Sequence, residues 1–152
     1  MFPLNSICDV TFSALRHSIR KNGNTWTLGK VILVADDEPV LRGLIRTLLH
    51  DEGYKVLTAA DGNEALRVSR AHEGMIDLLL TDVEMPRLDG ISTYRRISSE
   101  REGIKVLFMS GAIPESLQLP NGLPFLPKPF VTAALYAKVR EVLHVKSRAA
   151  VG

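Results

Sequence analysis

From residue 29 to residue 144 the chain alternates short apolar runs with helix-like segments, and this alternation restricts the fold more than any other feature. Strands that alternate with helices predict a parallel sheet, because a right-handed crossover returns each strand beside an earlier one and leaves helices on both faces. The sequence therefore predicts a five-stranded α/β sheet. The predicted strands are KVILVAD (30–36), YKVLTAA (54–60), IDLLLTDV (76–83), KVLFMS (105–110) and FLPKPF (125–130).

Four of the segments that join or follow these strands predict helices. The first begins near Pro39, which suits a first helical turn, and ends before Gly53. Its leucine and isoleucine side chains recur at steps of three and four residues, so they would lie on the sheet. The other helices are expected at about residues 63–72, 91–101 and 132–143.

The segment between the fourth and fifth strands breaks this pattern. It reads GAIPESLQLPNGLP and contains Pro114, Pro120 and Pro124. Since proline disfavours helix at the residue before it and removes a hydrogen-bond donor, at most one short helical turn fits, at about residues 115–119. We therefore expect a shortened or irregular fourth helix here.

Length and composition fit one globular domain with tails: 152 residues, 45% of them hydrophobic and 24% charged. The net charge of +2 gives no broad positive field, so direct nucleic-acid binding is not expected. A single cysteine, Cys8, excludes an internal disulfide and fits a reducing cytosol. No apolar run approaches the ~20 residues that cross a bilayer, and the N-terminus lacks a secretory pattern. We expect a cytoplasmic protein without membrane contact.

Polar residues stand where four of the predicted strands end. Asp36 and Asp37 follow the first, Asp82 the third, Ser110 the fourth, and Lys128 lies in the fifth run before a proline. Open parallel sheets bind ligands at this edge. Crowded carboxylates attract a hard divalent cation, while a hydroxyl and an ammonium can bind the oxygens of a phosphoryl group. The pattern indicates acyl-phosphate formation on an aspartate.

Each of these residues also has a purely structural interpretation. An aspartate often caps a helix or a turn, which would suffice for Asp36, Asp37 or Asp82 taken singly. Ser110 could be a turn hydroxyl. A lysine in a short apolar strand, such as Lys128, is harder to explain as a solvated surface charge.

The motifs DDEP, LLLTDVEMPRLDG, MSGA and PKPF, in this order, resemble the receiver domain of bacterial two-component response regulators. The resemblance covers about residues 30–144, and it implies the flavodoxin-like doubly wound fold with strand order 2-1-3-4-5. It implies that Asp82 is the phosphoacceptor. It further implies that Asp37, Asp82 and the backbone carbonyl of Glu84 bind Mg²⁺ directly, while Asp36 acts through water.

The same resemblance gives roles to three residues near the end of the domain. Ser110 would bind a phosphoryl oxygen, and Lys128 would pair with Asp82 before phosphorylation and with the phosphoryl group afterwards. Phe125 would be the aromatic switch residue whose rotamer reports phosphorylation, although it could also be an ordinary core residue. The family also has a cis peptide bond that corresponds here to Lys128–Pro129.

The function implied is a receiver that takes a phosphoryl group from a phosphohistidine on a sensor histidine kinase or a histidine phosphotransfer protein. Such a domain catalyses only its own phosphorylation and dephosphorylation. No second domain is visible after Leu143, so output would pass to a downstream protein target. The motifs also resemble receivers fused to hybrid histidine kinases, which leaves a detached module open.

Two other functions are compatible with parts of the pattern. A degenerate receiver could act as a constitutive protein-binding module, although all five site positions carry usable residues. A phosphatase that forms an aspartyl phosphate would carry a second acid two residues after the nucleophile, where Glu84 stands. Against this, no insertion for substrate recognition is visible, and the Asp36–Asp37 pair is on the wrong strand.

The expected receiver occupies residues 29–145, with an N-terminal extension at 1–28 and a tail at 146–152. Within the extension, an apolar stripe at helical spacing runs beside basic residues. This predicts either a short amphipathic helix that mediates docking or a homodimer, or a disordered segment. The stripe consists of Cys8, Phe12, Leu15 and Ile19, and the basic residues are Arg16, Arg20 and Lys21.

Overall fold

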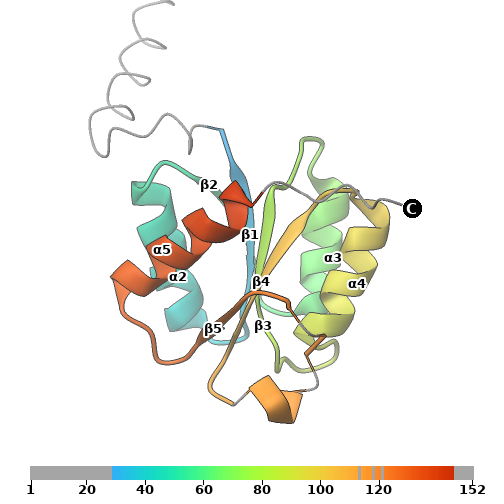
Figure 1. Cartoon of the computed structure of the whole chain (residues 1–152). Helices are drawn as coiled ribbons and strands as arrows, with labels where there is room; N and C mark the ends of the chain where they lie inside the picture. Colours follow the sequence, from blue (N-terminus) through green and yellow to red (C-terminus); the bar gives the residue numbers. More distant parts are fainter. Residues whose placement is uncertain (1–28, 113, 118, 121, 146–152) are drawn as a thin grey trace, which may run out of the picture.

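A computed structural model describes residues 29–112, 114–117, 119–120 and 122–145 (Figure 1). The predictions for the N-terminal extension and for the tail lie outside these residues. Within the described ranges, no helix is both long enough and apolar enough to span a bilayer.

Five parallel strands form one sheet in the order β2-β1-β3-β4-β5. This is the flavodoxin-like order, so the predicted fold is confirmed. Most strands are shorter than predicted because their end residues leave the regular ladder. The strands are β1 (Val31–Ala35), β2 (Lys55–Ala59), β3 (Leu78–Asp82), β4 (Lys105–Ser110) and β5 (Phe125–Pro127).

Helices cover both faces of the sheet (Figure 1). One face carries α2 (Pro39–Asp51) and α5 (Thr132–His144), and the other carries α3 (Gly62–Ala71) and α4 (Gly90–Glu100). All four predicted helices are present, with ends within one residue of the predicted positions. The N-caps of α3 and α4 are Asp61 and Asp89, whose carboxylates accept backbone N–H groups of the first turn.

The two faces of the sheet bury separate apolar clusters, because side chains alternate across each strand. Ile32 and Leu80 point to the layer under α2 and α5. Leu33 and Leu79 point to the layer under α3 and α4. The central strands β1, β3 and β4 are therefore buried on both faces of the sheet. This explains why their sequences read as continuous apolar runs.

Among the described residues between β4 and β5, the one helical element is a four-residue 3₁₀ helix, η2 (Pro114–Leu117). The prediction of one short turn is confirmed, but the turn begins one residue earlier than expected because proline is well suited to a first helical position. Partly buried side chains from this segment pack on the α3–α4 layer in place of a full helix. They are Leu117, Leu119, Leu123 and Phe125.

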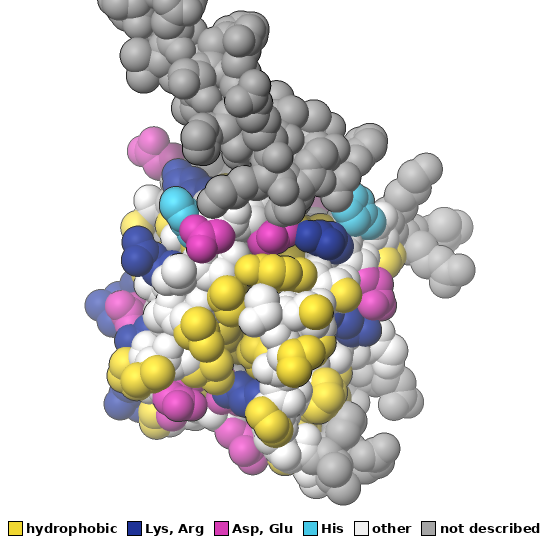
Figure 2. Space-filling model, turned by 90° about the vertical axis from the view of Figure 1, so that its left-hand side faces the viewer, with side chains coloured by type: hydrophobic (Ala, Val, Ile, Leu, Met, Phe, Trp, Pro, Cys, Tyr) yellow, Lys and Arg dark blue, Asp and Glu magenta, His cyan; other side chains and the backbone are white. Residues whose placement is uncertain are grey.

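Figure 2 views the face formed by α2 and α5, where hydrophobic side chains gather at the surface. Three of them are strongly exposed: Val40 at 79%, Leu44 at 52% and Val131 at 71%. Beside them runs a cavity of about 340 Å³ between α2 and the turn that follows β5.

Candidate functional site

Three carboxylates meet at the carboxyl edge of the sheet because β1 and β3 are neighbours. Asp36 follows β1 directly, Asp37 comes next, and Asp82 is the last residue of β3. One oxygen of each lies within 4.8 Å of the others. Asp36 is fully buried and Asp82 is 9% exposed, whereas Asp37 is open to solvent. The three residues therefore form one acidic cluster that is open to solvent at Asp37.

Lys128 reaches into this cluster from the turn after β5. Its Nζ lies 2.8 Å from Oδ2 of Asp82 and 2.9 Å from Oδ2 of Asp36. The lysine follows β5 directly, one residue beyond the strand, although the sequence placed it within the strand. The peptide bond to Pro129 is cis, as the resemblance implied.

The charges of this group are unbalanced, since one ammonium faces two carboxylates with a third alongside. Burial raises the pKa of the Asp82 carboxyl, and the Asp36 charge adds to this against the opposing bonds from Lys128 and Glu84. Burial alone would lower the pKa of Lys128, but its bonds to Asp82 and Asp36 and their charges raise it. Excess negative charge remains in the cluster, so a cation would stabilise it.

Backbone groups hold two of the carboxylates in place. Oδ1 of Asp36 accepts a hydrogen bond from the Glu38 N–H at 2.8 Å, just before α2 begins. Oδ1 of Asp82 accepts one from the Glu84 N–H at 3.1 Å. The turn role considered from sequence is thus confirmed for Asp36 and Asp82 and coexists with the ion pairs to Lys128, whereas the helix-cap role is wrong, because Glu38 is the N-cap of α2 and Asp89 that of α4.

Ser110 ends β4 at the same edge, and its hydroxyl is buried. Its Oγ accepts a hydrogen bond from the Ala112 N–H at 3.0 Å, while its carbonyl accepts the Lys128 N–H at 2.8 Å. A hydroxyl that accepts in this way can still donate its own hydrogen. Phe125 starts β5, is partly buried and packs on the α3–α4 layer.

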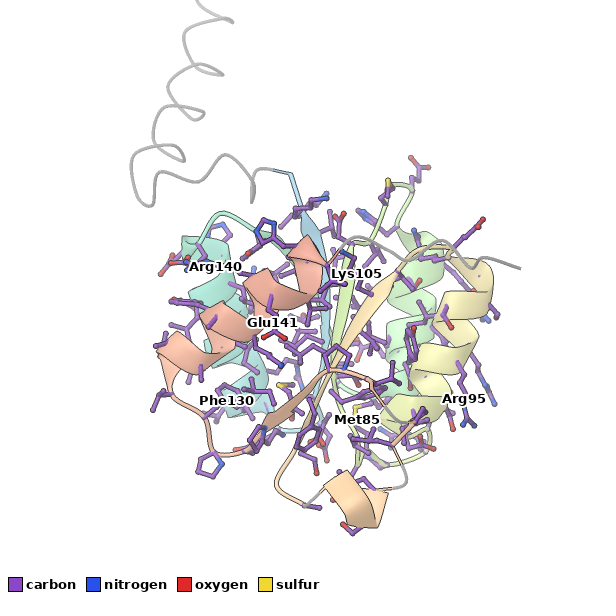
Figure 3. The ribbon with its side chains drawn as sticks, viewed as in Figure 1. Met85, Arg95, Lys105, Phe130, Arg140 and Glu141 are labelled. Atoms are coloured by element: carbon purple, nitrogen blue, oxygen red, sulfur yellow. The ribbon has the colours of Figure 1, made fainter. Side chains whose placement is uncertain are left out.

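The loop from Val83 to Asp89 leaves β3 beside Asp82 and leads into α4, and several of its residues had no predicted role. Gly90 lies so close to Asp82 that an added Cβ would sit 2.0 Å from the Asp82 carbonyl oxygen. Arg87 has a positive φ of 69°. Met85 lies near this edge on the α3–α4 side, and Phe130 lies on the α2–α5 side (Figure 3). In the sequence, the stretch RLDG (87–90) marks this loop as a turn before a helix. It does not reveal what the Arg87 side chain contacts.

The donor set fits a hard divalent cation, since it consists of three carboxylates whose oxygens lie within 4.8 Å of one another. The open side of the cluster adjoins a cavity of about 580 Å³. Asp37, Glu84 and Asp89 line it together with the apolar side chains of Met85, Ile91 and Leu117. Of the three acids of the cluster, Asp37 is the one that lines this cavity, so a cation can approach the cluster from solvent at Asp37.

Residues 32–140 match the family model of the response regulator receiver domain. The chain belongs to this family. The match extends from β1 into α5 and includes every residue of the acidic cluster as well as Ser110 and Lys128. The resemblance to receivers inferred from the motifs is confirmed.

The receiver is also similar to parts of larger curated proteins. It is 33% identical over 139 residues to the sensor kinase CckA of Brucella abortus, covering 89% of this chain and 15% of that protein. It is 35% identical over 115 residues to the transcriptional regulatory protein CpxR of Escherichia coli, covering 74% of this chain and 48% of that protein. The chain thus spans about half or less of these relatives.

Solved structures show the same fold. The receiver domain of the hybrid histidine kinase CckA matches with 37% identity and a TM-score of 0.65, covering 74% of this chain and 98% of that one. A chain of the CheX–CheY–BeF3–Mg²⁺ complex from Borrelia burgdorferi matches with 27% identity and a TM-score of 0.68, covering 76% and 90%. Both of these structural matches cover about three quarters of this chain, which is nearly the whole of the described domain.

Proposed function

We propose that this receiver accepts a phosphoryl group on Asp82 from a phosphohistidine and so relays a signal in a two-component system. The observation that carries the proposal is the Lys128 ammonium held between Asp82 and Asp36, at 2.8 and 2.9 Å. An ammonium in this position keeps the nucleophilic carboxylate oriented and can then bind the new phosphoryl oxygens.

In the transfer, a carboxylate oxygen of Asp82 bonds to phosphorus as the bond between phosphorus and the donor's imidazole nitrogen breaks. The electron pair of that bond leaves with the imidazole. Lys128 then moves its hydrogen bond from the carboxylate to a phosphoryl oxygen, and the Ser110 hydroxyl donates to another. The reaction depends on positioning and charge neutralisation, which agrees with the general logic of phosphoryl transfer.

We propose that Asp37, Asp82 and the Glu84 backbone carbonyl hold Mg²⁺, with Asp36 acting through water. This division is supported by burial, because Asp36 is fully buried whereas Asp82 is 9% exposed. Asp37 is the exposed acid and faces the adjoining cavity. When bound, Mg²⁺ would neutralise carboxylate charge and coordinate the incoming phosphoryl oxygen.

The donor would be a sensor histidine kinase or a histidine phosphotransfer protein, and the output a downstream protein target. Similarity to CckA and CpxR supports this assignment, since those relatives are named a sensor kinase and a transcriptional regulatory protein. The chain would turn over no external substrate and would catalyse only its own phosphorylation and dephosphorylation. We propose a cytoplasmic setting, where such donors present their phosphohistidines.

Incubation with acetyl phosphate and Mg²⁺ tests the proposal, because intact mass then reports one added phosphoryl group. Asp82→Asn should gain none, whereas Asp51→Asn, a control on the exposed end of α2, should behave as wild type. A phosphoryl group on Asp82→Asn that forms at the wild-type rate and is labile to hydroxylamine would overturn the assignment.

The two rival functions give different results in the same assay. A constitutive binding module would fold normally and take no phosphoryl group from acetyl phosphate. A phosphatase would instead hydrolyse p-nitrophenyl phosphate through many turnovers, and Glu84→Gln would stop it. We expect stoichiometric phosphorylation and no such turnover.

A further inference from the structure

Arg87 stands in the middle of the loop Val83–Asp89, five positions after the proposed phosphoacceptor. Its backbone φ angle is 69°. Among the non-glycine residues that the structure describes, Arg87 alone has a positive φ. Residues with a Cβ seldom adopt this conformation unless surrounding contacts impose it.

The guanidinium of Arg87 is bound to Asp61, which lies 26 positions earlier at the start of α3. Nε and Nη2 of Arg87 donate to Oδ2 of Asp61 at 3.1 and 2.5 Å. The Asp61 side chain is only 11% exposed, whereas that of Arg87 is 62% exposed. A buried carboxylate is thus neutralised by an arginine that reaches it from the phosphoacceptor loop.

Asp61 is itself fixed by the helix that it caps. Its Oδ1 accepts the Glu64 N–H at 2.8 Å, and the Glu64 carboxylate accepts the Ala60 N–H at 2.6 Å, which forms a reciprocal cap. The bond from the Glu64 N–H, followed by the bonds from Arg87, holds the pKa of Asp61 below its ordinary value. The acceptor of Arg87 is therefore a rigid, ionised group.

Close backbone approach supports the same attachment on the next residues. An added Cβ on Gly62 would lie 2.6 Å from the carbonyl oxygen of Leu88 and 2.2 Å from Oγ1 of Thr93. Gly90 N donates to the Val83 carbonyl at 2.8 Å, which closes the loop on itself. The far half of the loop is thus pressed against the start of α3, while Asp82 and Glu84 lie at its near end.

We propose that Arg87 is a positioning residue, whose ion pair with Asp61 holds the loop Val83–Asp89 so that the Glu84 backbone stays beside Asp82. The bonds of Arg87 go to Asp61, so it acts through the loop and not on the phosphoryl group. The inference rests on the proposed function, because Glu84 matters there as a donor to Asp82 and as a proposed ligand of Mg²⁺. A lysine could not replace Arg87 fully, since two nitrogens of one guanidinium bond the same carboxylate.

The main test compares Arg87→Gln with Arg70→Gln in the full chain. Arg70 binds Glu100 through Nε and Nη2 on the outer side of α3 and α4, so it makes a similar ion pair away from the site. Calorimetric titration with Mg²⁺ should show that Arg87→Gln weakens binding about 10-fold, as loss of an outer-shell partner does. Arg70→Gln should bind Mg²⁺ as wild type does.

Amide exchange in the metal-free protein gives a readout that needs no activity. Exchange of the Glu84 N–H should be faster in Arg87→Gln than in wild type, and unchanged in Arg70→Gln. Asp61→Asn should match Arg87→Gln, and the double variant should be no worse than either, because both remove the same contact. Equal Glu84 exchange in wild type and Arg87→Gln would overturn the proposal.

Arg87→Gly separates the ion pair from the backbone conformation, since glycine accepts a positive φ without strain. If the ion pair does the positioning, this variant should bind Mg²⁺ as weakly as Arg87→Gln. Wild-type affinity in Arg87→Gly would mean that the turn alone sets the loop, and would overturn the proposal. If wild type itself binds no Mg²⁺ and takes no phosphoryl group, the proposed function fails, while the exchange comparison still judges the ion pair.

Discussion

Asp82 and Lys128 titrate in a setting where negative charge is in excess, and this has consequences for stability. The pKa of Asp82 is raised, by burial first, so the folded state binds its proton more tightly than the unfolded state does. The ionised carboxylate therefore opposes folding at neutral pH, and this cost disappears as pH falls through the raised folded pKa. The pKa of Lys128 is also raised, so its contribution is complete below its ordinary value of 10.5 and is lost only as pH rises through the folded pKa.

We expect Asp82→Asn to melt at a higher temperature than wild type at neutral pH without metal. The advantage should shrink as pH falls from about 7 toward the ordinary carboxyl value of about 4, because wild-type Asp82 then takes up its proton. Melting curves of both proteins across this range test the prediction. An advantage that does not vary with pH would contradict it.

Gly90 is the residue at which an added methyl group should do most harm, because its Cβ would meet the Asp82 carbonyl oxygen. Gly90→Ala should lower the free energy of unfolding by about 3 kcal/mol, as overpacking against rigid backbone does. Gly43, inside α2, has no heavy atom within 4 Å of its Cβ position. Gly43→Ala should instead raise the stability by up to about 1 kcal/mol, and urea unfolding would compare the two.

At the residue scale, the acidic cluster, Ser110 and Lys128 could be found from sequence because each follows an apolar run at one edge of the sheet. Arg87 and Gly90 could not, since their partners Asp61 and Asp82 meet them only after tertiary packing. A positive φ at an arginine also leaves no compositional signal.

At the scale of elements, the helices could be predicted closely and the strand ends could not. Asp77 illustrates the reason: it stands one residue before β3, yet it bonds β1 through both its backbone and its side chain. β5 is an edge strand of only three residues, and the Lys128 N–H directly after it still donates to the Ser110 carbonyl of β4. The segment around η2 was predictable as irregular from its prolines, but not its packing on the α3–α4 layer.

Arg101 joins two helices, and sequence reasoning gave it no role. From the C-cap of α4 its guanidinium donates to Oγ and the carbonyl of Ser69, and to the carbonyls of His72 and Gly74 near the end of α3. These carbonyls need donors where the helix ends. Arg101→Lys, which keeps the charge but not the fork of donors, should lower the free energy of unfolding by about 2–3 kcal/mol.

A matched control is Arg95→Lys, because Arg95 points away from the domain on the exposed side of α4 (Figure 3). Its substitution should change stability by less than about 0.5 kcal/mol. Urea unfolding measures both variants. Similar small effects for Arg101→Lys and Arg95→Lys would show that the bonds to α3 contribute little.

At the scale of the whole molecule, every proposed site residue lies between Asp36 and Lys128. Deleting residues 1–28 should therefore leave phosphorylation by acetyl phosphate at the wild-type rate. If the extension mediates a homodimer, as its apolar stripe predicts, the deletion should lower the apparent mass in sedimentation. An unchanged sedimentation profile at high concentration would instead support the disordered alternative.

Mg²⁺ should stabilise the whole fold, because only the folded chain brings Asp36, Asp37 and Asp82 within 4.8 Å of one another. A ligand that binds only the folded state at ten times its dissociation constant adds roughly 1.4 kcal/mol. Asp37→Asn should remove this dependence, since Asp37 is the exposed acid of the cluster, and should also raise the metal-free melting temperature by relieving repulsion. Melting curves with and without millimolar Mg²⁺ measure both effects, with Asp51→Asn as the control. A wild-type curve that does not respond to Mg²⁺ would count against a metal site at this edge of the sheet.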